Sequence, residues 1–435
     1  MERSPKRRRL STQQAGEKIK GGQKEPRGQE EPIKTVPKID EKEAGGSNSS
    51  NNPLTKEEPK CLGFPNIGQT CYMNASLQSL LTLENFMDDI NKQANVWRVH
   101  PDAAVMRYLS KLKEEHSSED MPLKSFLLSK LKRAVSFDAP VFADDGQQDA
   151  HEFLCTLLYQ IMSLSPELQK AAATKGTTYS CPIKEHLSFK MENTRTCKRC
   201  GAESKKQEER MNLSLDVTPG GGTVEDMLQN YLQETELEYR CECGGIVSGQ
   251  RLSFKTLPRA LILHLNRVRY TPDYWLQKVT DPVDISRDLV ICSEEDGQCY
   301  SLVSTIKHLG TQAGSGHYIS EGMDLDVPVT DPSDRWFTYD DKMVTETSGA
   351  DVCEKGRRDA YILVYKRQVS TWPHHTEENC DVEKDIDDLI INVQSLLIRV
   401  GKRTPIHLSF YHLFGSRYGQ VQLPENNFLY SIYIN

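Results

Sequence analysis

The stretch Asn66-Ile-Gly-Gln-Thr-Cys71-Tyr-Met-Asn-Ala-Ser-Leu-Gln-Ser-Leu-Leu81 places a cysteine directly after a glycine-containing turn. Apolar residues then recur at helical spacing, at Met73, Leu77, Leu80 and Leu81. A helix start offers unpaired N–H groups and a positive dipole, which favour a thiolate at Cys71. The pattern therefore predicts a nucleophile, although a lone cysteine is more often a small buried apolar residue. Asn66 can donate its amide to an oxyanion or simply shape the turn.

Composition sets the broad class of this 435-residue chain, which is 37% hydrophobic and 27% charged. These values are typical of a soluble protein. No stretch reaches the ~18 uninterrupted apolar residues of a membrane span, and the N-terminus lacks an apolar signal core. We therefore expect no membrane partner. Twelve cysteines without a secretory signal indicate a reducing compartment, where thiols serve metals, catalysis or packing.

The net charge of −8 is unevenly distributed along the chain. Residues 1–60 carry 14 Lys/Arg against 10 Asp/Glu (+4), which leaves 40 against 52 (−12) for the rest. This head has no aromatic residue and no cysteine, so we expect it to be disordered. Its basic cluster Pro5-Lys-Arg-Arg-Arg9 predicts nuclear residence, with cytoplasmic residence as the alternative because short basic runs can simply aid solubility. The acidic body argues against nucleic acid as a partner.

Residues 61–367 have a globular composition, with helical patterns first and strand-like runs later. A second helix is indicated at Asp149–Met162. Strands are indicated at Ala260–Leu265, Tyr300–Ile306, His317–Ser320, Trp336–Tyr339 and Ala360–Tyr365. Helices followed by a sheet predict an α+β fold rather than alternating βαβ units.

A second chemical signal lies in Gly314-Ser-Gly-His317-Tyr-Ile-Ser, where a flexible approach delivers a histidine to the start of a strand. Asp340 and Asp341 end a later strand, so a neighbouring strand can bring a carboxylate beside the imidazole. Cysteine, histidine and aspartate would then serve as nucleophile, base and orienting group. Taken singly, His317 fits an ordinary core or surface histidine, and the aspartates fit a turn.

A third pattern combines two cysteine pairs, Cys197 with Cys200 and Cys241 with Cys243. Such pairs commonly hold a structural zinc ion in a tetrahedral knuckle. The second pair is Cys-x-Cys rather than Cys-x-x-Cys, which alters the turn that orients the sulfurs. A structural zinc is predicted, with an empty or weakened knuckle as the alternative.

Four segments together resemble the ubiquitin-specific proteases, a family of papain-like cysteine peptidases that cleave after the C-terminal glycine of ubiquitin. Over residues 61–367 they occur in the family's order: Gly63–Ala75, Gly146–Phe153, Gly316–Ile319 and Trp336–Asp341. Within the family, Glu236–Tyr239, Leu257–Leu265 and Ser315–Ser320 look most like the subgroup of ubiquitin carboxyl-terminal hydrolase 37.

The resemblance implies a papain-like α+β fold with a thumb (about 61–175), zinc-tipped fingers (about 176–265) and a palm (about 266–367). It implies Cys71 as nucleophile, His317 as base, Asp340 as its orienting group and Asn66 as oxyanion donor. Asp149 is implied to bind an arginine of the ubiquitin tail, although an acid at a helix start also simply complements the dipole. Asp341 is a secondary candidate for the group that orients His317, and it is also a candidate for binding substrate.

The implied partners are ubiquitin and ubiquitylated proteins, with a monomer as the expected state and no redox or nucleotide cofactor. An inactive ubiquitin-binding regulator is the alternative, and a zinc-ribbon nucleic-acid binder is a second one that the acidic body disfavours. Gln69 departs from the family, which usually has asparagine there. Tyr270 and Tyr300 are only 30 positions apart, where the subgroup carries a long insertion. With no folded domain expected before residue 61, we expect one ubiquitin site and a weak preference for polyubiquitin.

Residues 368–435 match nothing that we recognise in the family. Asp385–Val400 has an apolar stripe at helical spacing, which predicts an amphipathic helix with an acidic start. This helix could dock on the catalytic domain or a partner, or the segment could be a poorly ordered tail. Because all the motifs precede residue 368, a chain that ends near Val369 is expected to fold and cleave ubiquitin conjugates.

Overall fold

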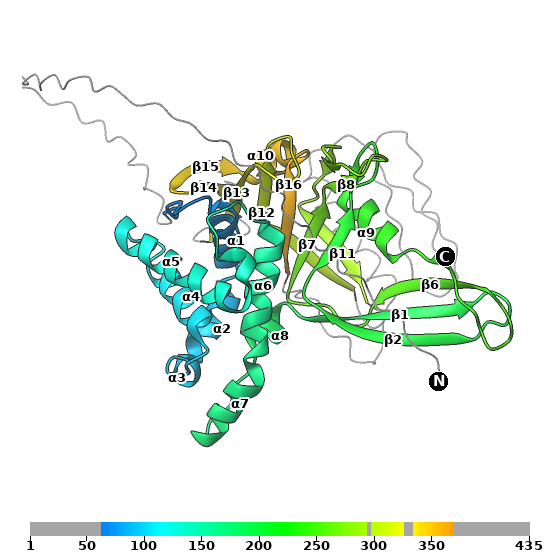
Figure 1. Ribbon diagram of the computed structural model, residues 1–435, viewed down its shortest axis with the longest axis horizontal. Helices are drawn as coiled ribbons and strands as arrows, with labels where there is room; N and C mark the ends of the chain where they lie inside the picture. The colour runs from blue at the N-terminus through cyan, green and yellow to red at the C-terminus, as the bar shows by residue number, and fades with distance from the viewer. Residues whose placement is uncertain (1–61, 294–296, 326–333, 369–435) are drawn as a thin grey trace, which may run out of the picture. The chain divides into compact units, whose positions relative to one another are not determined.

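The computed structural model describes residues 62–293, 297–325 and 334–368 (Figure 1). Three sequence-based expectations lie outside these residues: the head 1–60 with its Pro5–Arg9 cluster, the tail beyond 368, and the helix Asp385–Val400 within it. Within the described part, helices come first and the main sheet follows, which confirms the predicted α+β class. No helix in these ranges combines the length and the apolar character needed to cross a bilayer.

The N-terminal half of the described chain is helical. Its elements are α1 (Cys71–Leu81), α2 (Glu84–Lys92), α3 (Ala94–Trp97), α4 (Ala104–Glu114), α5 (Met121–Asp138), the 3-10 turn η1 (Pro140–Phe142), α6 (Ala150–Ser163), α7 (Ser165–Thr174) and α8 (Pro182–His186). Every residue of α1 is buried, because this helix packs between α6 and strand β13 (His317–Met323). The predicted helix at 149–162 is α6, for which Asp149 is the N-cap.

The main sheet has the strand order β15-β14-β13-β12-β16-β7-β3, with β11 also pairing β12. These strands are β3 (Leu213–Asp216), β7 (Ala260–Asn266), β11 (Asp288–Cys292), β12 (Gly297–Leu309), β14 (Arg335–Asp340), β15 (Met343–Ser348) and β16 (Ala360–Arg367). Neighbours are antiparallel except β3 and β7, which run parallel. The predicted fingers segment 176–265 thus contributes β3 and most of β7 to the palm sheet.

Both faces of this sheet are covered by apolar side chains. Along β16, Ile362 and Val364 pack with the helical core that contains Cys71, whereas Leu363 and Tyr365 pack in a second core on the opposite face. This alternation follows from the two-residue period of a strand. The second core also receives α9 (Val224–Leu232), which begins with a capping box between Thr223 and Asp226. Burial on both faces therefore fixes the register of the strands that carry His317 and Asp340.

A smaller sheet with the order β2-β1-β6-β5 extends away from the main sheet in Figure 1. It consists of β1 (Phe189–Cys197), β2 (Glu203–Arg210), β5 (Thr235–Glu238) and β6 (Val247–Phe254). The remaining elements are β4 (Gly222–Thr223) with β10 (Val283–Asp284), the hairpin of β8 (Val268–Tyr270) and β9 (Leu276–Lys278), and α10 (Gly349–Gly356). Two cysteines of the predicted knuckle lie at the far end of this smaller sheet. Strand β1 ends at Cys197, and the chain after β5 leads to Cys241.

Candidate active site

Cys71 is the first residue of α1, and its side chain is almost fully buried. Burial raises the pKa of the Cys71 thiol, and the nearby Asp341 carboxylate raises it further. Hydrogen bonds from the backbone of Tyr318, Tyr72 and Cys71 itself act in the opposite direction without cancelling the effect of burial. Burial of Cys71 therefore opposes the thiolate that the helix start favours, because desolvation outweighs the backbone N–H groups.

His317 and Asp340 meet at the end of two neighbouring strands. His317 begins β13 and Asp340 ends β14, and these strands pair in antiparallel register from Ser320 and Tyr339 onward. His317 Nε2 lies 2.6 Å from Asp340 Oδ1. A carboxylate in this position fixes the imidazole ring and stabilises its protonated form. The other ring nitrogen is left to act on a nucleophile.

The structure brings the thiol to the same place through the backbone of β13. Tyr318, which follows His317, hydrogen bonds through its main chain to Cys71. Helix α1 packs directly on β13, so the two segments are held together by the core rather than by a flexible loop. One centre therefore contains Cys71, His317 and Asp340. In the sequence, Cys71 and Asp340 are 269 positions apart.

Asn66 shapes the loop before α1 and also contacts the end of β14. Its side-chain oxygen accepts hydrogen bonds from the N–H groups of Gly68 at 3.1 Å and Thr70 at 3.0 Å. Its Nδ2 donates to Asp341 Oδ2 at 2.9 Å. An amide nitrogen carries two hydrogens, so this bond uses one of them. Asn66 thus serves as a turn residue here, and its amide nitrogen carries one hydrogen beyond the one donated to Asp341.

Asp341 has a different position from its neighbour Asp340. Its other carboxylate oxygen accepts a 2.7 Å hydrogen bond from Asn74 Nδ2, and its carbonyl accepts the N–H of Phe64 at 2.9 Å. It adopts φ +50°, a left-handed conformation that Asp tolerates better than most residues. The structure therefore places Asp341 as the link between the Cys71 segment and β14.

Asp149 caps α6 through Oδ1, which accepts the Glu152 N–H at 2.8 Å. Its Oδ2 accepts hydrogen bonds from the hydroxyls of Tyr318, at 3.3 Å, and Tyr361. Asp149 thus caps the start of α6, as one of the two interpretations of its position in the sequence predicted. The same carboxylate is half-buried and held by two tyrosines, so its direction is fixed for any cation that reaches it.

Gln69 adopts φ +49° in the loop before Cys71. This left-handed conformation favours glycine and asparagine over glutamine. The departure from asparagine that we noted in the sequence therefore falls at a position where asparagine is the easier residue, and the chain tolerates the strain.

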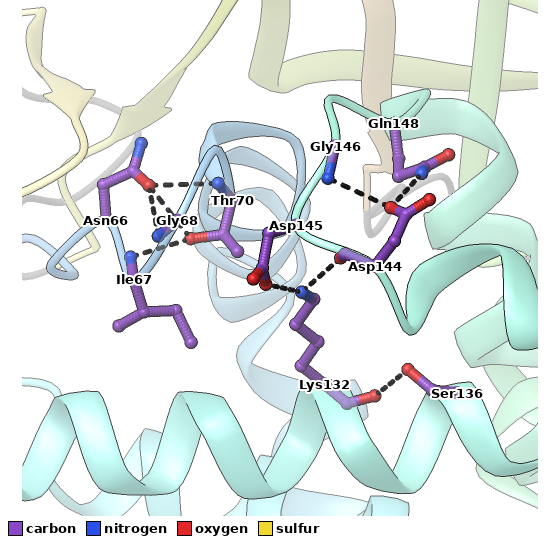
Figure 2. A network of polar contacts seen from close by, with 10 residues as sticks. All are labelled: Asn66, Ile67, Gly68, Thr70, Lys132, Ser136, Asp144, Asp145, Gly146 and Gln148. Carbon is purple, nitrogen blue, oxygen red and sulfur yellow. Dashed lines mark hydrogen bonds and ion pairs between the residues drawn. The ribbon is translucent and has the colours of Figure 1, made fainter. Parts of the chain in front are cut away.

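Figure 2 shows the hydrogen bonds that brace the loop before α1 and the loop before α6. In the loop before α6, the Asp144 carboxylate accepts the Gly146 N–H at 3.0 Å and Gln148 Nε2 at 2.9 Å. Lys132 donates from α5 to the carbonyl of Asp144 at 2.6 Å and to the carboxylate of Asp145 at 3.1 Å. The segment that leads into Asp149 is thereby fixed to the helical side of the centre.

Sequence reasoning missed Gln147, although the segment that contains it was recognised. Gln147 Nε2 donates to the carbonyl of Gly316 at 2.9 Å, and the Gly316 N–H donates to Gln147 Oε1 at 3.1 Å. The contact joins residues 169 positions apart. The sequence pointed to this contact only indirectly, because Gln147 lies two residues before Asp149 in the recognised segment.

The four predicted knuckle cysteines form a single cluster, with all sulfurs within 4.8 Å of one another. Cys197 lies opposite Cys243 at 3.7 Å, and Cys200 lies opposite Cys241 at 3.8 Å. Backbone N–H groups of Cys200 and Arg199 lower the pKa of Cys197 to about 6. Such a set of sulfurs, with N–H groups aimed at them, fits a thiophilic cation.

Glycines complete the shortened Cys-x-Cys turn. The N–H of Gly245 points at Cys243 Sγ at 3.4 Å, and Gly244 adopts φ +81°. A Cβ on Gly245 would lie 2.9 Å from Arg199 Cβ and 3.0 Å from Cys197 Sγ, so any larger residue would force its neighbours to shift. The missing residue is thus compensated by two glycines that allow the sulfurs to approach each other.

A helix that carries a cysteine at its start, packed on a sheet that carries histidine and aspartate, defines the papain-like cysteine peptidase class. The sequence model of the ubiquitin carboxyl-terminal hydrolase family matches residues 62–365. The chain belongs to this family, which confirms the resemblance seen in the sequence.

Relatives include the subgroup that the sequence resembles. Ubiquitin carboxyl-terminal hydrolase 37 of Mus musculus is 31% identical over 78% of this chain and 37% of its own length. The Homo sapiens protein of the same name is 35% identical over 57% of this chain and 28% of its own length. Ubiquitin carboxyl-terminal hydrolase 29 of Homo sapiens is 32% identical over 53% of this chain and 28% of its own length. The chain therefore spans about a third of the length of these curated relatives.

Solved structures share the fold. A SAGA DUB module of Ubp8, Sgf11, Sus1 and Sgf73 bound to monoubiquitin matches with a TM-score of 0.60 and 24% identity, over 73% of this chain and 72% of that chain. The same module bound to ubiquitin aldehyde matches with a TM-score of 0.60 and 23% identity, over 73% of this chain and 72% of that chain. At these identities the likeness establishes the architecture.

Proposed function

We propose that this chain is a deubiquitinating cysteine peptidase that hydrolyses the isopeptide or peptide bond after the C-terminal glycine of ubiquitin. The 2.6 Å contact between His317 and Asp340, beside the buried thiol of Cys71, carries this proposal. Family membership and the ubiquitin-bound structural neighbours support it. The alternative of an inactive ubiquitin-binding regulator is not favoured, because such a protein has no need to retain Cys71 together with a paired His317 and Asp340.

Because burial raises the pKa of the Cys71 thiol, attack requires that His317 take up the thiol proton. The resulting thiolate attacks the carbonyl carbon of the terminal glycine, and the charge on the carbonyl oxygen is met by the second N–H of Asn66. His317 then returns the proton to the departing lysine amine as the carbon–nitrogen bond breaks. Water, deprotonated by His317, hydrolyses the thioester and restores the Cys71 thiol.

Asp340 and Asp149 play separate roles in this scheme. Asp340 keeps His317 in one orientation and stabilises the imidazolium that forms in each half-reaction. Asp149 offers its carboxylate to an arginine of the ubiquitin tail, a role that the family resemblance implies and that charge-assisted bonding would make favourable. Tyr318 and Tyr361 hold that carboxylate in place.

We propose zinc as the cation held by Cys197, Cys200, Cys241 and Cys243. Zinc bound there would join the turns of the β1–β2 and β5–β6 hairpins and stabilise the end of the smaller sheet, where β2 is almost entirely exposed. No catalytic step depends on it. The exposure of β2 on both faces supports a need for such a link.

Nuclear residence is proposed from the Pro5–Arg9 cluster alone. A fluorescent fusion that lacks residues 1–20 should lose its nuclear enrichment relative to the full chain. An equally nuclear truncated fusion would contradict this assignment.

The function is tested by replacing the nucleophile and the base separately. Cys71→Ser and His317→Ala should each lower cleavage of a ubiquitin conjugate by about 10³-fold or more while the thermal midpoint stays near that of the wild type. Cys353→Ser, in α10 and outside the centre, is the matched control and should retain full activity. Turnover at the wild-type rate in Cys71→Ser would contradict the proposal.

A further inference from the structure

The amide of Gln147 bonds to both main-chain groups of one residue on the opposite side of the centre. Its Nε2 donates to Gly316 O at 2.9 Å, and Gly316 N donates to its Oε1 at 3.1 Å. Two such bonds to a single residue are the pattern of a hydrogen-bonded pair in an antiparallel sheet. Gln147 therefore binds Gly316 in the way a segment of extended main chain would.

Gly316 lies next to the catalytic candidates along the chain. It directly precedes His317, and the following residue, Tyr318, contacts the Cys71 thiol through its backbone. A strand rises about 3.3 Å per residue, so Gly316 lies roughly 6–7 Å along the chain from Tyr318. This is the length of two extended residues. A carbonyl placed at Cys71 would thus bring the residue or two before it alongside Gly316.

The main chain of Gly316 is available for such pairing because of where it lies in the sheet. Strand β13 begins to pair with β12 at His317 and with β14 only at Ser320. Both described hydrogen bonds of the Gly316 main chain go to Gln147. A Cβ on Gly316 would overlap the ring of His308 and the carbonyl of Leu309, so only glycine can present its peptide groups here.

Gln147 is held in position by its neighbours in the chain. The residues on either side of it, Gly146 and Gln148, both donate to the Asp144 carboxylate, as Figure 2 shows. Lys132 fixes the carbonyl of Asp144 to helix α5. Because the backbone around Gln147 is braced, little further ordering is needed to direct its side chain at Gly316. The contact is thus a built feature of the free protein.

We propose that Gln147 occupies the substrate position on Gly316 in the free enzyme, and that the extended tail of ubiquitin displaces it and takes over its two hydrogen bonds. This inference rests on the proposed function and identifies a self-inhibitory contact within the same centre. The competition opposes binding and leaves the chemical step unchanged. Because both bonds are neutral and Gln147 is exposed, their loss should change affinity by about three- to tenfold.

Steady-state hydrolysis of ubiquitin with a fluorogenic C-terminal amide tests the inference on the full chain. Gln147→Ala should lower KM about three- to tenfold and leave kcat within about twofold. Gln147→Asn, whose amide is one methylene shorter, should behave in the same way. Gln233→Ala, an exposed glutamine at the end of α9, is the matched control and should leave both constants unchanged.

Binding in the absence of turnover separates this inference from the proposed function. In a Cys71→Ala background, Gln147→Ala should tighten the Kd for ubiquitin by the same factor. Wild-type protein that neither cleaves nor binds ubiquitin would overturn both. Active wild-type protein with an unchanged or higher KM in the folded Gln147→Ala and Gln147→Asn variants would overturn only the self-inhibitory contact, since Gln147 would then be neutral or would hold the substrate.

Discussion

Asp341 accepts a 2.9 Å hydrogen bond from Asn66, a residue 275 positions earlier in the chain. Its second oxygen accepts Asn74 Nδ2 at 2.7 Å, so one carboxylate joins the loop before Cys71, helix α1 and the end of β14. The preceding residue, Asp340, orients His317. The two adjacent aspartates therefore have different contacts: Asp340 bonds to His317, and Asp341 bonds to Asn66 and Asn74.

Replacing Asp341 should disturb catalysis by moving Asn66. Asp341→Asn keeps a residue that tolerates φ +50°, but its single amide oxygen cannot serve both asparagines. We expect kcat to fall about tenfold with a smaller change in KM, because the lost contact positions a transition-state donor. Asp351→Asn in α10 is the matched control. Wild-type kcat in a folded Asp341→Asn variant would show that Asn66 needs no such support.

Acid should destabilise the fold through buried histidines. Burial lowers the pKa of His116 to about 3, of His264 to about 3 and of His308 to about 4. An unfolded histidine titrates near pH 6.5, so unfolding takes up protons between that value and the folded pKa. Stability is therefore full above about pH 6.5 and is lost as the pH falls toward 4.

The variant His116→Gln isolates one of these contributions. Glutamine can still donate to Gln78, which lies 2.7 Å from His116 Nε2. In denaturant unfolding below about pH 6, the free energy of unfolding should fall less steeply with pH than in the wild type, by up to about 1.4 kcal/mol per pH unit. Parallel slopes for the two proteins would mean that His116 is protonated in the folded state.

The cysteine cluster should contribute metal-dependent stability. Cys197→Ser removes one of four ligands, so the protein should release about one zinc per chain and its thermal midpoint should fall by more than about 5 °C. Cys299→Ser on β12 is the matched control, and both should be compared by elemental analysis and thermal unfolding. Wild-type protein free of zinc after purification without chelators would reject the assignment.

Local patterns were sufficient to predict the fold class and the positions of the main catalytic candidates. The helix after Cys71, the strand that begins at His317 and the strand that ends at Asp340 each follow from a few consecutive residues. The contacts of Gln147 with Gly316 and of Asp341 with Asn66 did not follow, because they depend on side-chain directions across the finished core. The raised pKa of the Cys71 thiol was also missed, since its burial comes from packing of α1 against β13 rather than from the helix start itself.

Covalent capture with a ubiquitin probe that carries a C-terminal electrophile tests most directly whether Cys71 is the nucleophile. Mapping the adduct by mass spectrometry should place a single ubiquitin on Cys71, with strongly reduced labelling in His317→Ala because the buried thiol then has no base. Cys353→Ser should be labelled like the wild type. Absence of an adduct on folded wild-type protein, or an adduct on another cysteine that persists in Cys71→Ser, would contradict the proposed catalytic centre.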